Sequence, residues 1–181
     1  MLLEAAKTSL LIVYVQQRLL PVMQEPERVV ARIQILLRTA KELDIPVTIS
    51  EQYPKGLGHT VPELATNAAQ VFEKLTFSCW RDPAMRAHFI GLHERERPLV
   101  IVAGIEAHVC VLQSCIDLYN AGFGVFAVAD AMSARTAQSS NLAFDRLRGV
   151  GIQVINTEMA VFELLEKAGT PEFKTLSALI R

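Results

Sequence analysis

The chain has 181 residues, of which 18 are basic and 19 acidic, and its formal net charge of −1 excludes the basic surface that binding to a nucleic-acid backbone requires. Its apolar fraction of 51% and mean hydropathy of +0.27 are high for a soluble monomer. They predict a sheet covered on both faces, an apolar subunit interface, or both, so we expect a homo-oligomer. The length suits one domain spanning residues 1–181.

Targeting and membrane signals are missing from the sequence. The N-terminus lacks the basic segment and apolar run of a signal peptide, and no stretch approaches the roughly 18 apolar residues of a membrane-spanning helix. Three cysteines with no Cys-x-x-Cys pair fit neither a disulfide framework nor a zinc ribbon. We therefore expect a cytoplasmic protein with free thiols and neither membrane nor nucleic acid as a partner.

Short apolar runs of the buried-strand type alternate with helical periodicity along the chain. In chain order they predict a strand at 10–15, a helix at 26–43, a strand at 47–50, a loop at 51–59, a minor strand or extended segment at 71–77, a helix at 82–93, a strand at 99–103, a helix between 104 and 122, a strand at 125–129, a loop at 130–135, a helix at 141–147, a strand at 152–155, and helices at 158–167 and 171–179. Such alternation predicts an α/β fold in which helices cover both faces of a mostly parallel sheet.

The stretch from Pro98 to Gly122 contains the strongest candidate for chemistry. A buried strand ends at Gly104, and an amphipathic helix follows with Cys110 in its first turn. Unpaired backbone N–H groups and the positive end of the helix dipole favour a thiolate there. Cys110 is therefore a candidate nucleophile, whereas Cys79 and Cys115 lack this placement and are expected in the core.

Lys74 is a candidate partner for that thiol. A free thiol with a pKa of about 8.5 is only a few per cent ionised at neutral pH, so a nearby cation would help it react. Lys74 is framed by Phe72, Leu75 and Phe77, which places an ammonium in an apolar setting. Two interpretations stay open: a partly desolvated ammonium beside Cys110, or a surface lysine whose stem covers apolar side chains.

Five segments, in order and spacing, resemble an isochorismatase-like cysteine hydrolase. They are Val13-Tyr-Val-Gln16, Glu73-Lys-Leu-Thr-Phe-Ser78, Gly104-Ile-Glu-Ala-His-Val-Cys-Val111, Asp130-Ala-Met-Ser-Ala-Arg135 and Thr157-Glu-Met-Ala-Val-Phe-Glu163. The similarity covers nearly the whole chain, and the 51–58 loop resembles the isochorismatase-domain-containing subgroup, whose substrates are poorly defined.

The resemblance implies a three-layer α/β/α sandwich and a triad of Asp, Lys and Cys. Matched by position, the nucleophile is Cys110, the lysine is Lys74, and the aspartate position is occupied by Tyr14. The resemblance also implies a cis peptide between Ile105 and Glu106, and an oxyanion hole made by the backbone N–H groups of Glu106 and Cys110. Such donors stabilise the charge that develops on a carbonyl oxygen under attack.

The reaction implied is attack of the Cys110 thiolate on a small amide-like substrate, followed by hydrolysis of the thioester. Tyr14 weakens this reaction, because a phenol with a pKa near 10 is a poor base at neutral pH. Three hypotheses follow: Lys74 and the helix terminus alone hold a thiolate; Glu51 or Glu106 supplies the carboxylate; or the protein is a catalytically silent homologue that binds a small molecule or assembles with a partner.

Cofactors and metals have no signature in the sequence. The four histidines form no ligand pattern, and no glycine-rich nucleotide-binding motif is present. We therefore expect neither cofactor nor metal. The substrate pocket is expected beside Glu51 and Tyr53, which lie near strand ends.

Overall fold

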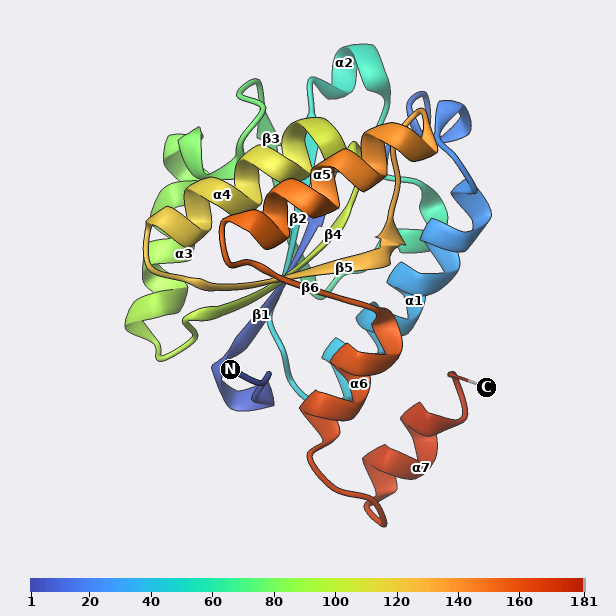
Figure 1. The fold of residues 1–181 in the computed structure, drawn as a ribbon, viewed down its shortest axis with the longest axis vertical. Coiled ribbons are helices and arrows are strands. Elements are labelled where there is room, and N and C mark those ends of the chain that lie inside the picture. Colours follow the sequence, from blue (N-terminus) through green and yellow to red (C-terminus); the bar gives the residue numbers. More distant parts are fainter. Residues whose placement is uncertain (181) are drawn as a thin grey trace.

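The computed structural model describes residues 1–180, which form a six-stranded parallel sheet in the order β3-β2-β1-β4-β5-β6 (Figure 1). The strands are β1 (Thr8–Val13), β2 (Val47–Gln52), β3 (Ala69–Lys74), β4 (Leu99–Gly104), β5 (Gly124–Met132) and β6 (Gln153–Ile155). Every residue of β1 and β4 is buried, because these central strands are covered on both faces.

Helices cover both faces of the sheet, which confirms the predicted three-layer α/β architecture. Helices α1 and α6 lie on one face, and α3, α4 and α5 lie on the other (Figure 1). The helices are α1 (Pro26–Glu42), α2 (Pro54–Leu57), α3 (Pro83–Glu94), α4 (Leu112–Asn120), α5 (Ala137–Gly149), α6 (Thr157–Leu165) and α7 (Pro171–Ser177). Short 3-10 turns span Ala5–Lys7, Leu20–Val22, Pro62–Leu64 and Cys79–Arg81, and a π-helical turn spans Ala107–Val111.

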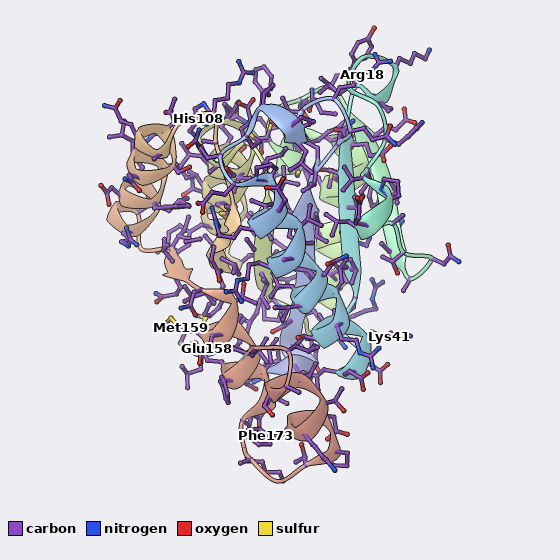
Figure 2. All side chains as sticks on the ribbon, turned by 90° about the vertical axis from the view of Figure 1, so that its right-hand side faces the viewer. Arg18, Lys41, His108, Glu158, Met159 and Phe173 are labelled. Carbon is purple, nitrogen blue, oxygen red and sulfur yellow. The ribbon has the colours of Figure 1, made fainter. Side chains whose placement is uncertain are left out.

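The strand order reverses between β1 and β4. From β1 the chain moves outward through β2 to β3, and from β4 it moves outward the other way through β5 to β6. In open α/β sheets, ligands bind at the carboxyl ends of the strands beside such a reversal. Figure 2 shows His108 and Arg18 at this end of the molecule, while Lys41 and Phe173 lie toward the other.

Three predicted boundaries were wrong. The first strand ends at Val13 rather than at residue 15, because Tyr14 has a φ of 23°, outside the extended region. The predicted irregular loop at 51–59 begins inside β2 and contains the single turn α2. The predicted loop at 130–135 begins inside β5, which extends to Met132.

The remaining boundaries differ from the prediction by a few residues. The segment at 71–77 is an edge strand that ends at Lys74, and the helix predicted at 141–147 is longer at both ends. The last two helices end before residues 167 and 179. Among the described residues, the helices are too short or too polar to cross a membrane.

Gly104 joins β4 to the segment that carries Cys110. Its φ is +117°, and a Cβ built there would lie 2.2 Å from the carbonyl oxygen of Val13. Replacing Gly104 with alanine should therefore force the ends of β1 and β4 apart and lower the free energy of unfolding by about 2 kcal/mol or more, as strained backbone positions do. Urea unfolding followed by circular dichroism measures this loss.

The matched control is Gly149→Ala, at the end of α5, where a Cβ would meet nothing within 4 Å. Because alanine restricts the unfolded chain more than glycine does, this control should leave stability unchanged or raise it by about 0.5–1 kcal/mol. Equal stability of the two variants would contradict the tight β1–β4 junction.

Candidate active site

The sheet register aligns the ends of β1 and β4, and separately the ends of β2 and β3. Val13 pairs with Gly104, so the residues that follow β1 and β4 leave the sheet side by side. At the sheet edge, Gln52 pairs with Lys74, the last residue of β3. The Lys74 Nζ atom lies over the Tyr14 ring, 5.1 Å from its centroid. Two of the residues matched to the triad are thus in direct contact.

Cys110 lies in the π-helical turn that precedes α4 and is 1% exposed. Burial raises the pKa of its thiol, and the Lys74 ammonium and hydrogen bonding with Tyr14 offset only part of this increase. From its position at a helix start, Cys110 was predicted to favour the thiolate. The structure instead favours the protonated thiol at neutral pH. Burial explains the difference, because desolvation penalises the charged form.

Lys74 is 3% exposed, so the interpretation as a surface lysine is wrong. Its Nζ donates hydrogen bonds to the side-chain oxygen of Gln52 at 2.6 Å and to the carbonyl oxygens of Thr76 and Phe77 at 2.8 and 3.0 Å. All three acceptors are neutral. The positive charge of Lys74 is therefore not cancelled by an ion pair, and it is the strongest influence lowering the pKa of Cys110.

Tyr14 fills the position next to the thiol. Its backbone N–H donates to the carbonyl oxygen of Ser50 at 3.1 Å, and its side chain is 3% exposed. Burial, and then the neighbouring Cys110, raise the pKa of the phenol far above its usual value, while hydrogen bonding from the Glu106 amide acts in the opposite direction. The phenol stays protonated across the physiological range and cannot serve as a base.

The turn between β4 and Cys110 contains the residues implied for the oxyanion hole. The peptide bond between Ile105 and Glu106 is cis. Glu106 is 7% exposed. Its carboxylate forms an ion pair with Arg135, in which the Arg135 Nε lies 2.9 Å from the Glu106 Oε2. This carboxylate acts on the pKa values of both Tyr14 and Cys110, raising each. Glu106 thus lies within electrostatic range of the thiol.

Glu51 is engaged elsewhere. Its carboxylate accepts hydrogen bonds from the backbone N–H and the hydroxyl of Thr60, at 2.7 and 2.8 Å, and lies 2.9 Å from the Nδ1 atom of His59. Successive side chains of a strand point to opposite faces, so Glu51 projects away from the face that carries Ser50 and Gln52. Its role is to fix the 59–60 segment against β2.

The pH dependence of stability tests this role of Glu51. Burial raises the pKa of the carboxyl, but hydrogen bonds from Thr60 and His59 outweigh it and leave the pKa below its ordinary value of 4.5. A lowered folded-state pKa contributes stability above the unfolded-state value, and this contribution is lost as the pH falls through the folded-state value. The unfolding free energy of Glu51→Gln should therefore depend less steeply on pH below about 4.5 than that of the wild type.

Urea unfolding at pH values from 3 to 6 measures the slope. Glu94→Gln, a change at an exposed position, is the matched control and should retain the wild-type slope. A slope for Glu51→Gln as steep as that of the wild type would contradict the assignment.

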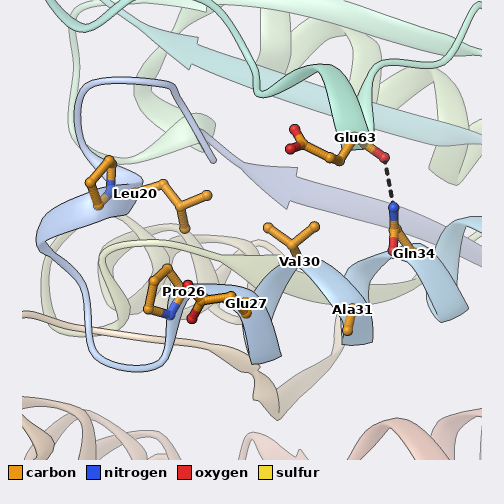
Figure 3. Close-up of a pocket in the computed structure, with 8 residues that line it drawn as sticks. Leu20, Pro26, Glu27, Val30, Ala31, Gln34 and Glu63 are labelled. Atoms are coloured by element: carbon orange, nitrogen blue, oxygen red, sulfur yellow. Dashed lines mark hydrogen bonds between the residues drawn. The ribbon is translucent and has the colours of Figure 1, made fainter.

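A cavity of about 460 Å³ adjoins the end of β3. Its lining includes Lys74, Thr76 and Asp82, together with Tyr53 from the predicted pocket, but not Glu51. A second cavity of about 390 Å³ lies between α1 and the two 3-10 turns at 20–22 and 62–64 (Figure 3). The cavity at β3 is the better candidate for substrate entry, because Lys74 reaches it.

Within residues 1–180, no three His, Cys, Asp or Glu side chains gather as metal ligands. Cys79 and Cys115 are free and fully buried. Gln16 and Gln52 were not predicted as site residues, although each is a polar residue at or just after the end of an apolar run, which is the signal that marks them.

Comparison with known proteins identifies relatives over most of the chain. The Isochorismatase domain family matches residues 8–159. The secreted isochorismatase effector Isc1 of Phytophthora sojae is 38% identical over 151 residues, covering 81% of this chain and 71% of that protein. Isochorismatase domain-containing protein 1 of Danio rerio is 37% identical over 169 residues, covering 92% of this chain and 58% of that protein.

Solved structures share the fold. The MAR1 ribonuclease of Caenorhabditis elegans superposes with a TM-score of 0.90 at 32% identity, covering 99% of this chain and 92% of that one. The YcaC gene product of Escherichia coli, described as an octameric hydrolase of unknown specificity, gives a TM-score of 0.90 at 22% identity, covering 98% of this chain and 90% of that one. With its six-stranded parallel sheet and its match over residues 8–159, the chain belongs to the isochorismatase family.

Proposed function

We propose that residues 1–181 form one hydrolase domain that cleaves a small amide-like substrate through a thioester on Cys110. The observation that carries this proposal is the buried, un-neutralised Lys74 ammonium, which acts on the Cys110 thiol at the reversal of the sheet. A positive charge beside a cysteine favours the thiolate that attacks a carbonyl carbon. The family supports hydrolase chemistry in general.

In the proposed reaction, the thiol loses its proton and its sulfur attacks the carbonyl carbon. The oxyanion accepts hydrogen bonds from the backbone N–H groups of Glu106 and Cys110. The C–N bond then breaks, and the nitrogen leaves with a proton as an amine. Water hydrolyses the thioester to a carboxylic acid and restores the thiol.

Tyr14 limits two steps of this reaction. The first step needs an acceptor for the thiol proton, and the departing nitrogen needs a donor. Of the two alternative carboxylates, Glu51 is held by Thr60 and His59, while Glu106 lies in electrostatic range of Cys110. Glu106 is therefore the carboxylate that we assign as a substitute base, although it also forms an ion pair with Arg135.

The test is hydrolysis of a panel of small primary amides and anilides by the wild type and by Cys110→Ala. An RNA oligonucleotide belongs in the panel, because one similar structure is that of a ribonuclease. We expect slow amide hydrolysis that Cys110→Ala abolishes and that the matched control Cys79→Ala retains. Equal activity in Cys110→Ala, or cleavage of RNA alone, would overturn the proposal.

A second candidate is a catalytically silent homologue that binds a small molecule or assembles with a partner. The observation that favours it is the 1% exposure of Cys110, together with the raised pKa of its thiol. The amide panel separates the two candidates. Hydrolysis that depends on Cys110 excludes the silent protein, and a folded wild type without any turnover supports it.

The proposed hydrolase acts as a cytoplasmic homo-oligomer without a cofactor. Apolar side chains on the surface support self-association: among them Leu75 is 74% and Phe77 57% exposed, beside the cavity at β3. The similar YcaC structure is described as octameric. Light scattering after size-exclusion chromatography tests this point, and a monomer at micromolar concentration would contradict it.

A further inference from the structure

The ammonium of Lys74 has no proton left to donate to Cys110 or to a substrate. Its three N–H bonds are directed to Gln52, Thr76 and Phe77. Lys74 therefore influences the thiol through its charge, and that influence depends on where the Nζ atom is held. Two of the acceptors are main-chain carbonyl oxygens, so Gln52 provides the one side chain among the three.

The Gln52 side chain is itself fixed. Its Nε2 donates to the carbonyl oxygen of Leu75 at 2.8 Å, which orients Oε1 toward Lys74. Its backbone N–H donates to the side-chain oxygen of Gln16 at 2.7 Å, and its carbonyl oxygen accepts from the Gln16 side chain at 3.2 Å. Gln16 is fully buried. A chain of hydrogen bonds thus runs from Gln16, which follows β1, through Gln52 of β2 to the ammonium of Lys74 on β3.

The chemistry of the amide suits this position. A glutamine oxygen accepts a proton from an ammonium without cancelling its charge, whereas a glutamate would form an ion pair. The neighbouring register pair consists of Glu51 and Glu73, whose side chains project to the opposite face because strand residues alternate. Because Gln52 is neutral, this register pair places no carboxylate beside the Lys74 ammonium.

We propose that Gln52 is a positioning residue, which holds the Lys74 ammonium against the Tyr14 ring without neutralising it, so that the charge acts on Cys110. This inference rests on the proposed function, because it explains how the nucleophile would be supported. The titratable groups that act on Cys110 are Lys74 from β3, Tyr14 after β1, Cys79 from the 79–81 turn and Glu106 from the turn after β4.

The test is the pH dependence of Cys110 alkylation by iodoacetamide, with the labelled peptide quantified by mass spectrometry. Gln52→Glu should slow alkylation at pH 8 by about tenfold or more, because neutralising Lys74 moves the thiol titration upward by about one pH unit. Gln52→Met, which removes the acceptor without adding charge, should slow it by about two- to fivefold. Gln34→Glu, the same change at an exposed position on α1, should have no effect.

A double-mutant cycle separates positioning from general structural damage. When Lys74 is already methionine, Gln52→Glu should change the rate by less than about twofold, because the charge that it neutralises is gone. An unchanged titration in both Gln52 variants, or an equal shift with Lys74 absent, would overturn the inference. Alkylation needs no substrate. The two tests can therefore fail separately: an amide panel without turnover would overturn the hydrolase proposal and leave the alkylation result for Gln52 unaffected.

Discussion

Replacing Tyr14 with aspartate should raise Cys110-dependent amide hydrolysis at pH 7 by about 100-fold or more. A positioned general acid–base contributes about 10²–10⁴ in rate, and the phenol cannot supply this function because its pKa is raised far above neutrality. Aspartate also tolerates the positive φ of 23° at this position better than tyrosine does. The shorter side chain also removes the phenol that neighbours the thiol.

The matched control is Tyr14→Asn, which has the shape of aspartate but no titratable carboxylate. It opens the site equally and should give no more than a small gain in kcat. Comparable gains in the two variants would assign the effect to access rather than to proton transfer. If Tyr14→Asp folds and hydrolyses no amide in the panel, then Tyr14 alone does not limit the site.

Replacing Lys74 with methionine should have the second-largest effect. Lys74 is the strongest influence that lowers the pKa of Cys110, so its removal should raise that pKa and slow alkylation at pH 8 by about tenfold or more. The oxygens of Gln52, Thr76 and Phe77 also lose their donor. Because these acceptors are only partly buried, losing their donor should lower the free energy of unfolding by about 1 kcal/mol.

Lys55→Met is the matched control, because Lys55 lines the same cavity and is exposed. It should leave both the alkylation rate and the urea midpoint within error of the wild type. Alkylation of Lys74→Met at the wild-type rate across pH 6 to 9 would contradict electrostatic support of the thiol.

Local sequence patterns were sufficient to predict the layers of the fold, but they left open whether Lys74 is buried or lies at the surface. The run from Leu99 to Ala103 is apolar and β-branched because both faces of β4 are covered. The period-two pattern over residues 71–77 predicted a minor strand or extended segment that carries Lys74, and β3 ends at this residue. Periodicity reports such features because it reflects which side of an element meets the core.

Features that depend on distant residues could not be predicted in this way. Asp130 belongs to β5 rather than a loop, and its carboxylate accepts hydrogen bonds from the Thr157 N–H and hydroxyl at 2.8 and 2.9 Å. The burial that raises the pKa of Cys110 also depends on distant segments, because the 107–111 turn packs against α4, α5 and β4. The support of Lys74 by Gln52 likewise requires the β2–β3 register, which no local pattern contains.

Direct detection of an acyl group on Cys110 tests the nucleophile itself. The wild type is mixed with a small nitrophenyl ester, quenched in acid after seconds to minutes, and digested for mass spectrometry. Because Tyr14 provides no base for hydrolysis of the thioester, we expect the acyl mass to accumulate on the peptide that contains Cys110 and to approach one group per chain. Tyr14→Asp should shorten the lifetime of this adduct. An ester consumed with no acyl group on Cys110, or with labelling only at Cys79 or Cys115, would contradict the assignment.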